Sequence, residues 1–176
     1  MHRHNIYRYC PRCGGHLEKK YVKDGEPERL VCSRCGFIFY LDPKVAACAV
    51  IEIDGGIVMV RRAISPAVGK WVIPGGFVDV GETVPEAARR EVEEETTLTV
   101  TIGPLIGVYS YSDSSVVVVV YEATRTAGTM TAGDETLETV LFPLSEIPWD
   151  DIPFSSTKDA LQDYLKGQTL HLNKKG

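Results

Sequence analysis

Three glutamates near the end of one amphipathic segment form the arrangement in this chain that most clearly suggests chemistry. When a helix over residues 83–96 is turned by about 100° per residue, its apolar side chains gather on one face. Glu91 and Glu95 fall in the middle of this face and Glu94 at its edge, whereas Glu93 falls on the opposite face. Carboxylates one turn apart on a buried face cannot both stay ionised without a counterion. Because all the ligands are oxygens, we expect Mg²⁺ or Mn²⁺ here, with a salt-bridged surface helix as the alternative.

Four cysteines near the N-terminus form a second set with the spacing of a metal site. They occur as two C-x₂-C pairs with eighteen residues between them, and they are Cys10, Cys13, Cys32 and Cys35. Two thiolates separated by two residues can reach one ion, and two such pairs complete a tetrahedral site for structural Zn²⁺. Two disulfides or four free thiols are the alternatives, and disulfides would need an oxidising compartment for which the sequence has no signal. Cys48 lies in an apolar run and is expected to be a core residue.

Charge divides the chain at about the same place as the cysteines do. Residues 1–44 hold nine basic and five acidic side chains, whereas the rest holds ten basic and nineteen acidic ones. We therefore expect a zinc ribbon over residues 1–42 and a second domain over residues 43–176. The ribbon is too short to build a core of its own, so the metal would supply much of its stability. Its scattered basic charges leave nucleic-acid binding open, but we favour a structural or dimer-forming role.

The second domain must supply a sheet on which the glutamate helix can pack. Thr83 and Glu86 form a capping box that places the start of this helix, and Pro85 is tolerated in the first turn. Strands outnumber helices and do not alternate with them, which predicts an α+β domain with a mixed sheet flanked by helices. The other expected elements are strands over 45–53, 57–60, 71–73, 98–102, 116–123 and 140–142, a helical turn over 145–147 and a helix over 156–166.

The glutamate helix and the loop before it also carry a demanding pattern, G-x₅-E-x₇-R-E-U-x-E-E-x-x-U, where U is aliphatic. Its positions are filled here by Gly76, Glu82, Arg90, Glu91, Val92, Glu94, Glu95 and Leu98. This pattern resembles the Nudix box of the Nudix hydrolases. The resemblance implies that Glu91, Glu94 and Glu95 bind a divalent metal and that Arg90 and Glu82 orient the carboxylates. Thr97 stands where the family usually has glycine, and a β-branched residue resists a left-handed helix end, so we expect the helix to end differently here.

Nudix substrates share a nucleoside diphosphate linked to another group, so the resemblance implies an Mg²⁺-dependent pyrophosphohydrolase. The metal would neutralise the diphosphate oxygens and lower the pKa of the attacking water. The family adds a carboxylate from a loop before a late strand, and we favour Glu135 over Glu138 for this catalytic and metal-binding role, with an ordinary acidic loop as the alternative. The residues expected to bind substrate are Arg62, Gly76, Glu82 and Glu138, with Arg61 competing for the phosphate contact of Arg62.

The resemblance extends over residues 9–166, to the zinc-ribbon Nudix group that includes FAD/ADP-ribose pyrophosphatases. The motifs that carry it are the two Cys-x₂-Cys-Gly pairs, Tyr40-x₂-Pro43-Lys44, Trp71-x₂-Pro74, Glu146-Ile147-Pro148 and Phe154-Ser155-Ser156. It implies cleavage of ADP-ribose or FAD to AMP plus ribose 5-phosphate or FMN. A neighbouring group that cleaves NADH has a Ser-Gln-Pro-Trp-Pro-Phe-Pro-type motif after the box, which residues 102–115 lack. NADH, NAD-capped RNA and a damaged nucleoside triphosphate are the alternative substrates.

The chain has the composition of a globular protein and none of the marks of membrane insertion or secretion. No stretch approaches the roughly 18 consecutive apolar residues of a membrane span, and the N-terminus has no apolar signal core. We therefore expect a cytoplasmic enzyme whose partner is a small-molecule nucleotide rather than a membrane or a nucleic acid, and family resemblance implies a homodimer. The alternative from another functional class is a catalytically silent Nudix-fold module whose ribbon binds nucleic acid or regulates transcription.

Overall fold

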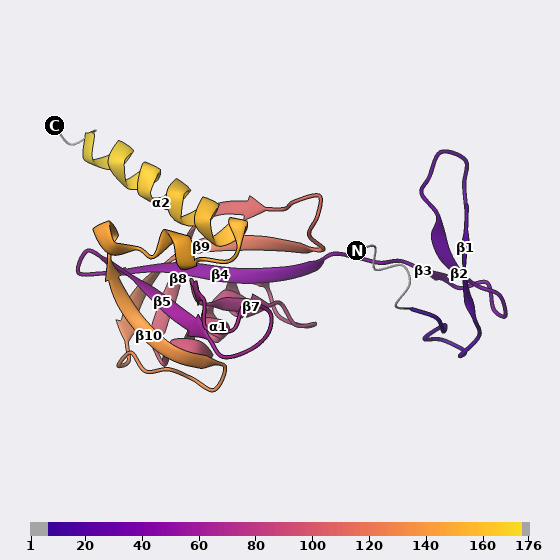
Figure 1. The fold of residues 1–176 in the computed structure, drawn as a ribbon, viewed down its shortest axis with the longest axis horizontal. Helices are drawn as coiled ribbons and strands as arrows, with labels where there is room; N and C mark the ends of the chain where they lie inside the picture. The colour runs from indigo at the N-terminus through magenta and orange to yellow at the C-terminus, as the bar shows by residue number, and fades with distance from the viewer. Residues whose placement is uncertain (1–6, 174–176) are drawn as a thin grey trace. The chain divides into compact units, whose positions relative to one another are not determined.

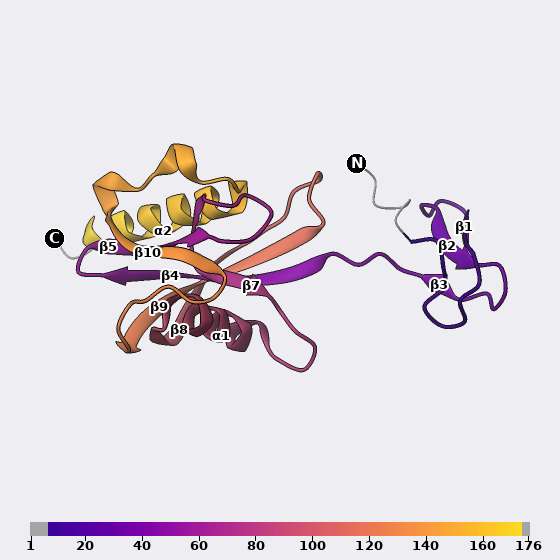
Figure 2. The ribbon, with the colours of Figure 1, turned by 60° about the horizontal axis from the view of Figure 1, so that its bottom comes forward.

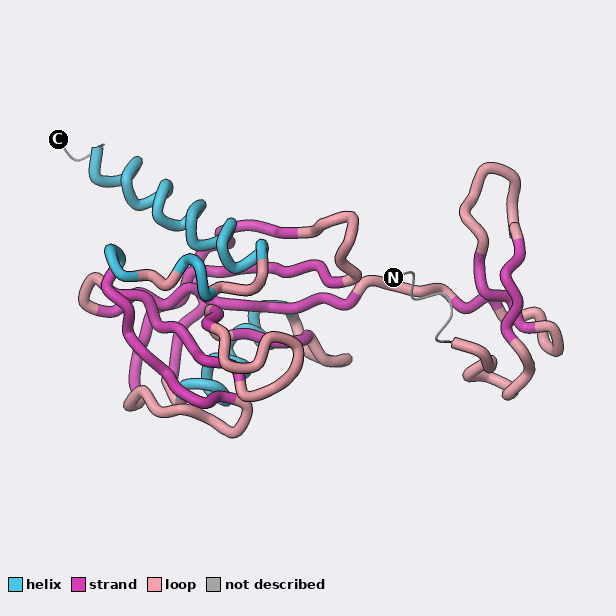
Figure 3. Tube along the Cα trace, in the orientation of Figure 1, coloured by secondary structure: helices cyan, strands magenta, loops and turns pink. Residues whose placement is uncertain are grey.

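The computed structural model describes residues 7–173, and the chain forms two compact units that divide between Asp42 and Pro43 (Figure 1). Among the described residues, both α-helices belong to the second unit and the first contains only strands and loops (Figure 3). The first unit is a small antiparallel sheet in which strands pair in chain order. Its strands are β1 (Leu17–Lys20), β2 (Arg29–Cys32) and β3 (Ile38–Phe39).

The second unit is built on a seven-stranded mixed sheet, which confirms the fold class predicted from the sequence. Strand β4 pairs in parallel with β9 and antiparallel with β5 and β7. Across the sheet the order is β10-β5-β4-β9-β8, with β6 paired to β5 and β7 to β4. The bounds are β4 (Lys44–Ile53), β5 (Gly56–Arg62), β6 (Trp71–Val72), β7 (Gly75–Phe77), β8 (Thr99–Tyr109), β9 (Val116–Ala127) and β10 (Thr136–Pro143).

A tight turn joins β4 to β5 and sets the position of the residues that leave the hairpin. Asp54 and Gly55 have φ values of 48° and 79°, the pair of positive angles that a two-residue type I′ turn requires. The turn places Ile53 opposite Gly56 and sends β5 back through an apolar run to Arg62. The strands expected over residues 45–53 and 57–60 are therefore the two arms of a hairpin.

Two helices cover opposite faces of this sheet, α1 (Val84–Thr96) and α2 (Ser155–Asn173) (Figure 2). Successive residues of a strand point to opposite faces, so Ile51 of β4 packs with Val92 of α1, whereas Val50 packs with Leu161 of α2. Two 3-10 turns, η2 (Leu144–Glu146) and η3 (Trp149–Asp151), precede α2. Within the described part of the chain, neither helix is both long and apolar enough to cross a membrane.

Both ends of α1 are fixed by residues that the sequence singles out. The N–H of Thr83 donates to the Glu86 carboxylate at 2.7 Å, as expected for a capping box. At the other end Thr97 has a φ of 56° and its N–H donates to the Glu93 carbonyl at 2.9 Å. The expectation that threonine would prevent a left-handed helix end is therefore wrong. The Thr97 hydroxyl donates to the Thr129 carbonyl at 2.5 Å, which offsets part of a steric cost of about 1–2 kcal/mol.

Several elements differ from those expected, and three differences bear on the region of the glutamates and the loops around them. Strand β8 continues to Tyr109 instead of ending at Ile102, with register shifts along its pairing with β9 that interrupt a simple alternation. Strand β10 begins at Thr136 rather than at residue 140, so Glu138 lies in a strand and not in a loop. Strand β7 was not predicted, because its glycine pair shows no apolar alternation.

Candidate active site

Arg90 is the centre of a carboxylate network on α1. Its guanidinium donates to both oxygens of Glu82, at 2.7 and 3.1 Å, to Glu91 at 2.7 Å and to Glu94 at 3.1 Å. It also donates to the Phe77 carbonyl at 3.1 Å. The two-pronged contact with Glu82 is charge-assisted, and the hydrogen bond from Arg90 lowers the pKa of Glu82 to about 2. Arg90 thereby fixes the directions of Glu91 and Glu94.

The glycines of Pro74-Gly75-Gly76 lie against the remaining carboxylates. The N–H of Gly75 donates to Glu95 Oε2 at 2.9 Å. A Cβ at Gly76 would lie 2.4 Å from the Glu91 carboxyl group, and a Cβ at Gly75 would lie 2.5 Å from the Ala47 carbonyl oxygen. Glycine at these two positions therefore makes room for the carboxylates and for the neighbouring strand. A direct contact between Gly76 and substrate stays a prediction.

Glu91 and Glu95 lie in an environment that disfavours their charged forms. Burial raises the pKa of Glu95 to about 7, against the opposing hydrogen bond from Gly75. Burial also raises the pKa of Glu91, against the hydrogen bond from Arg90, and the side chain of Glu91 is only 16% exposed. Glu94 differs, with 58% of its side chain exposed. The protonated, neutral forms of Glu91 and Glu95 are thus favoured despite the hydrogen bonds that oppose them.

Glu135 lies close enough to Glu91 and Glu95 for its charge to repel theirs, whereas Glu138 pairs with an arginine of the neighbouring strand. The charge of Glu135 is one of the causes that raise the pKa values of both Glu91 and Glu95. Glu138 instead pairs with Arg61 at 3.7 Å, and both side chains are about half exposed. The structure therefore brings Glu135 to the helix carboxylates and directs Glu138 to an ion pair with the neighbouring strand.

Arg62 provides a positive charge on the same side of the sheet. Its Nε donates to the Pro66 carbonyl at 2.8 Å, and its guanidinium lies over the Phe154 ring at 5.5 Å from the centroid. Its charge opposes the burial effect by lowering the pKa of Glu95, which places Arg62 near the carboxylates. The sequence did not predict the contacts with Pro66 and Phe154, although Phe154 belongs to a motif that it singled out.

The helix carboxylates fit a divalent cation by their chemistry, although they are not gathered around one point. Among the side chains of residues 7–167, the one group of metal-ligating residues whose ligand atoms all lie within 4.8 Å of one another is the cysteine group. One nitrogen of Arg90 bridges Glu91 and Glu94, whereas Glu95 is held separately by the Gly75 N–H. Burial and mutual repulsion at Glu91 and Glu95 nevertheless favour a bound cation, and an all-oxygen set suits Mg²⁺ or Mn²⁺.

The raised pKa of Glu95 predicts a pH dependence that metal reverses. Between about pH 4.3 and pH 7 the folded state keeps a proton that the unfolded state has lost, so metal-free stability falls as pH rises through this window. Because a cation needs the carboxylate form, Mg²⁺ should raise the Tm more at about pH 8 than at about pH 5.5. Comparing the Tm of the wild type and Glu95→Gln at both pH values isolates the contribution of Glu95. Equal Mg²⁺ effects at both pH values would contradict this prediction.

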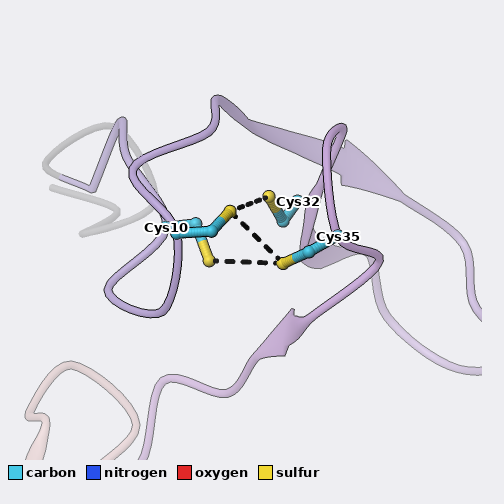
Figure 4. A group of neighbouring side chains, drawn as sticks. Cys10, Cys32 and Cys35 are labelled. Carbon is cyan, nitrogen blue, oxygen red and sulfur yellow. Dashed lines mark hydrogen bonds between the residues drawn. The ribbon is translucent and has the colours of Figure 1, made fainter.

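The four N-terminal cysteines converge on one point, and Figure 4 shows Cys10, Cys32 and Cys35 turned toward it. The Sγ atom of Cys13 lies 3.5 Å from Sγ of Cys32 and 3.4 Å from Sγ of Cys35. The Sγ atoms of Cys10 and Cys35 are 3.8 Å apart. A tetrahedral Zn²⁺ with bonds of about 2.3 Å needs sulfur atoms about 3.8 Å apart. The backbone N–H groups of Cys35 and Arg34 help lower the pKa of the Cys32 thiol to about 6. All four are free thiols, so the geometry suits zinc and not disulfides.

The comparison with protein families agrees with both groups of residues. Residues 42–161, which include α1 and its carboxylates, match the family model described as NUDIX domain. The chain belongs to the Nudix hydrolase family. Residues 8–41 match the model described as Nudix N-terminal, the zinc-ribbon family, and contain all four converging cysteines. This Nudix chain is therefore a pyrophosphohydrolase with a ribbon at its N-terminal side.

Individual relatives of the Nudix chain include enzymes with different substrates. It is 34% identical over 157 residues to an ADP-ribose pyrophosphatase from Methanocaldococcus jannaschii, covering 87% of each chain. It is 27% identical over 149 residues to an NAD-capped RNA hydrolase from Vibrio atlanticus, of which it spans about half. A crystal structure of a Nudix hydrolase from Nitrosomonas europaea superposes with a TM-score of 0.86 at 34% identity, covering 91% of both chains.

Proposed function

We propose that this Nudix hydrolase cleaves the diphosphate of ADP-ribose or FAD, giving AMP plus ribose 5-phosphate or FMN. The observation that carries metal-dependent cleavage is the placement of Glu91 and Glu95 in a partly buried position beside Glu135, where their charges repel one another. We propose these three and Glu94 as the ligands of Mg²⁺ or Mn²⁺. When bound, the ion would neutralise diphosphate oxygens and make a water more acidic for attack on phosphorus.

The chain's own residues have separate tasks in this proposal. Arg90 holds Glu91 and Glu94 in fixed directions before the cation arrives. The N–H of Gly75 holds one oxygen of Glu95 and leaves the other oxygen available. Arg62 is anchored by Pro66 and Phe154, and in this proposal it would bind a phosphate oxygen of the substrate. Glu135 either completes the cation site or takes the proton from the attacking water.

The zinc ribbon is proposed as a structural Zn²⁺ site formed by Cys10, Cys13, Cys32 and Cys35. The convergence of four free thiols and the match to the zinc-ribbon family support it. The homodimer and the cytoplasmic location expected from the sequence stay predictions, and so does the expectation that nucleic acid is not a partner.

The substrate proposal rests on the overall similarity of this chain to an ADP-ribose pyrophosphatase over nearly all of both proteins. NAD-capped RNA is the second candidate, because a relative with that activity also matches most of this chain. Residues 102–115, where NADH-cleaving relatives are expected to carry their motif, lack that motif and form the second part of β8 and the loop after it. This difference favours ADP-ribose or FAD.

A substrate panel tests the proposal directly. The release of AMP from ADP-ribose, FAD and NADH, and the release of nicotinamide mononucleotide from an NAD-capped RNA, are measured at equal Mg²⁺ concentration, together with hydrolysis of nucleoside triphosphates. We expect kcat/KM for ADP-ribose or FAD to exceed the others by at least about tenfold, or about 1.4 kcal/mol in transition-state binding. A preference for NADH or for capped RNA would overturn the substrate assignment while leaving the reaction class intact. No metal-dependent hydrolysis of any of these compounds would overturn the proposed function.

A further inference from the structure

The last turn of α1 is held by a segment that comes from a distant part of the chain. We call residues 129–135 the capping segment. A helix leaves its final carbonyl groups without partners inside the helix. Here the N–H of Thr131 donates to the Thr96 carbonyl at 3.0 Å and the N–H of Gly133 donates to the Glu95 carbonyl at 3.1 Å. The Thr97 hydroxyl adds a third bond, at 2.5 Å to the Thr129 carbonyl.

The capping segment ends at Glu135, the carboxylate that faces the helix carboxylates. Its position is fixed from both sides by backbone hydrogen bonds. The N–H of Thr136 donates to the Gly133 carbonyl at 3.1 Å, and the N–H of Ala63 donates to the Glu135 carbonyl at 3.0 Å. The first bond ties Glu135 to the residue docked on α1, and the second ties it to the end of β5 beside Arg62.

Gly133 makes the closest approach between the capping segment and the helix. A Cβ at this position would lie 1.8 Å from the carbonyl oxygen of Glu94 and 2.9 Å from its carbonyl carbon. These are backbone atoms of α1 and cannot turn aside as a flexible side chain could. Any other residue at position 133 would therefore push the capping segment away from the helix that carries Glu94 and Glu95.

We propose that Gly133 is a positioning residue that sets the distance between Glu135 and the carboxylates of α1. The backbone of Gly133 contacts the backbone of Glu94 and Glu95. Glu135 and the carboxylates of α1 therefore come from different elements that are joined by one fixed contact. The inference deepens the proposed function and rests on it, because it assigns Gly133 an effect only through Glu135. A substitution of Gly133 would move Glu135 relative to α1 without changing any carboxylate side chain.

A double-mutant cycle separates this role from simple loss of stability. Gly133→Ala is expected to lower kcat for ADP-ribose by about 100-fold, the effect of misplacing a catalytic group by roughly 1 Å, with KM changed less than about twofold. Glu135→Gln should lower kcat at least as much. Adding Gly133→Ala to Glu135→Gln should then lower kcat by no more than about twofold further. Gly103→Ala is the matched control, because its Cβ would lie at an ordinary 3.4 Å from the Glu122 carbonyl oxygen.

A milder variant keeps the test open if Gly133→Ala does not fold. Thr97→Val keeps the shape of the side chain and removes only the hydroxyl bond to Thr129, so a smaller loss of kcat is expected, of about threefold. That loss should also vanish in the Glu135→Gln background. Losses that multiply in the double variants would overturn the inference while leaving Glu135 in its role. Full activity of Glu135→Gln would overturn both the inference and the proposed role of Glu135, while the assignment of Glu95 would stand.

Discussion

Glu95→Gln is expected to reduce kcat by at least about 1,000-fold, which corresponds to about 4 kcal/mol of transition-state stabilisation. The substitution keeps the shape of the side chain and removes the charge that a cation would bind. Because burial disfavours that charge in the metal-free protein, the variant should be folded, with a Tm at or above that of the wild type near pH 8. Steady-state kinetics with ADP-ribose and Mg²⁺, together with thermal unfolding, measure both effects.

The matched control for this prediction lies on the same helix. Glu93 is two residues away on the opposite face, where it forms a surface ion pair with Arg89 at 3.8 Å. Exposed pairs of this kind contribute at most about 1 kcal/mol to stability. Glu93→Gln should therefore keep kcat within about threefold of the wild type. If Glu95→Gln behaves like Glu93→Gln, the carboxylates on the inner face of α1 have no part in hydrolysis.

The second large effect is expected at the ribbon. Cys32→Ser should abolish zinc binding and unfold the first unit, because ribbon-sized segments depend on metal binding worth about 10–16 kcal/mol. The second unit has its own core and should keep its fold and most of its hydrolytic activity. Metal analysis of the purified protein and limited proteolysis of the first unit provide the measurements.

Cys48→Ala is the control for the zinc prediction, because Cys48 is a free thiol in the sheet and not in the cysteine group. It should retain one zinc ion per chain, as the wild type should. Stoichiometric zinc in Cys32→Ser would contradict the four-cysteine site. A protease-resistant first unit in zinc-free wild-type protein would contradict the dependence of the ribbon on metal.

The local parts of this molecule were predictable because their signals lie within a few residues. The capping box at Thr83 and Glu86 gives the start of α1, and the 3.6-residue period gives the face that carries Glu91 and Glu95. The C-x₂-C spacing gives the cysteine site in the same way. These patterns reflect the geometry of one turn or one helix, which depends little on the rest of the chain.

The parts that were not predicted depend on contacts between distant residues. Nothing near residue 133 indicates that this backbone docks on the end of α1, because the partner carbonyls lie about forty positions earlier. The left-handed Thr97 is tolerated through a bond to Thr129, which a local propensity cannot contain. Glu138 lies in a strand because β10 extends its pairing along β5 as far as Thr136. In each case contacts between distant residues, and not the local sequence pattern, determine the conformation.

The most direct test of the central claim is the position of the divalent cation. Crystals grown with Mn²⁺ and a non-hydrolysable ADP-ribose analogue would give anomalous scattering that locates the ion independently of the protein atoms. We expect at least one manganese coordinated by carboxylate oxygens of Glu91, Glu94 and Glu95, in contact with the diphosphate. Manganese bound elsewhere on the chain, or a diphosphate lying away from these three side chains, would contradict the account.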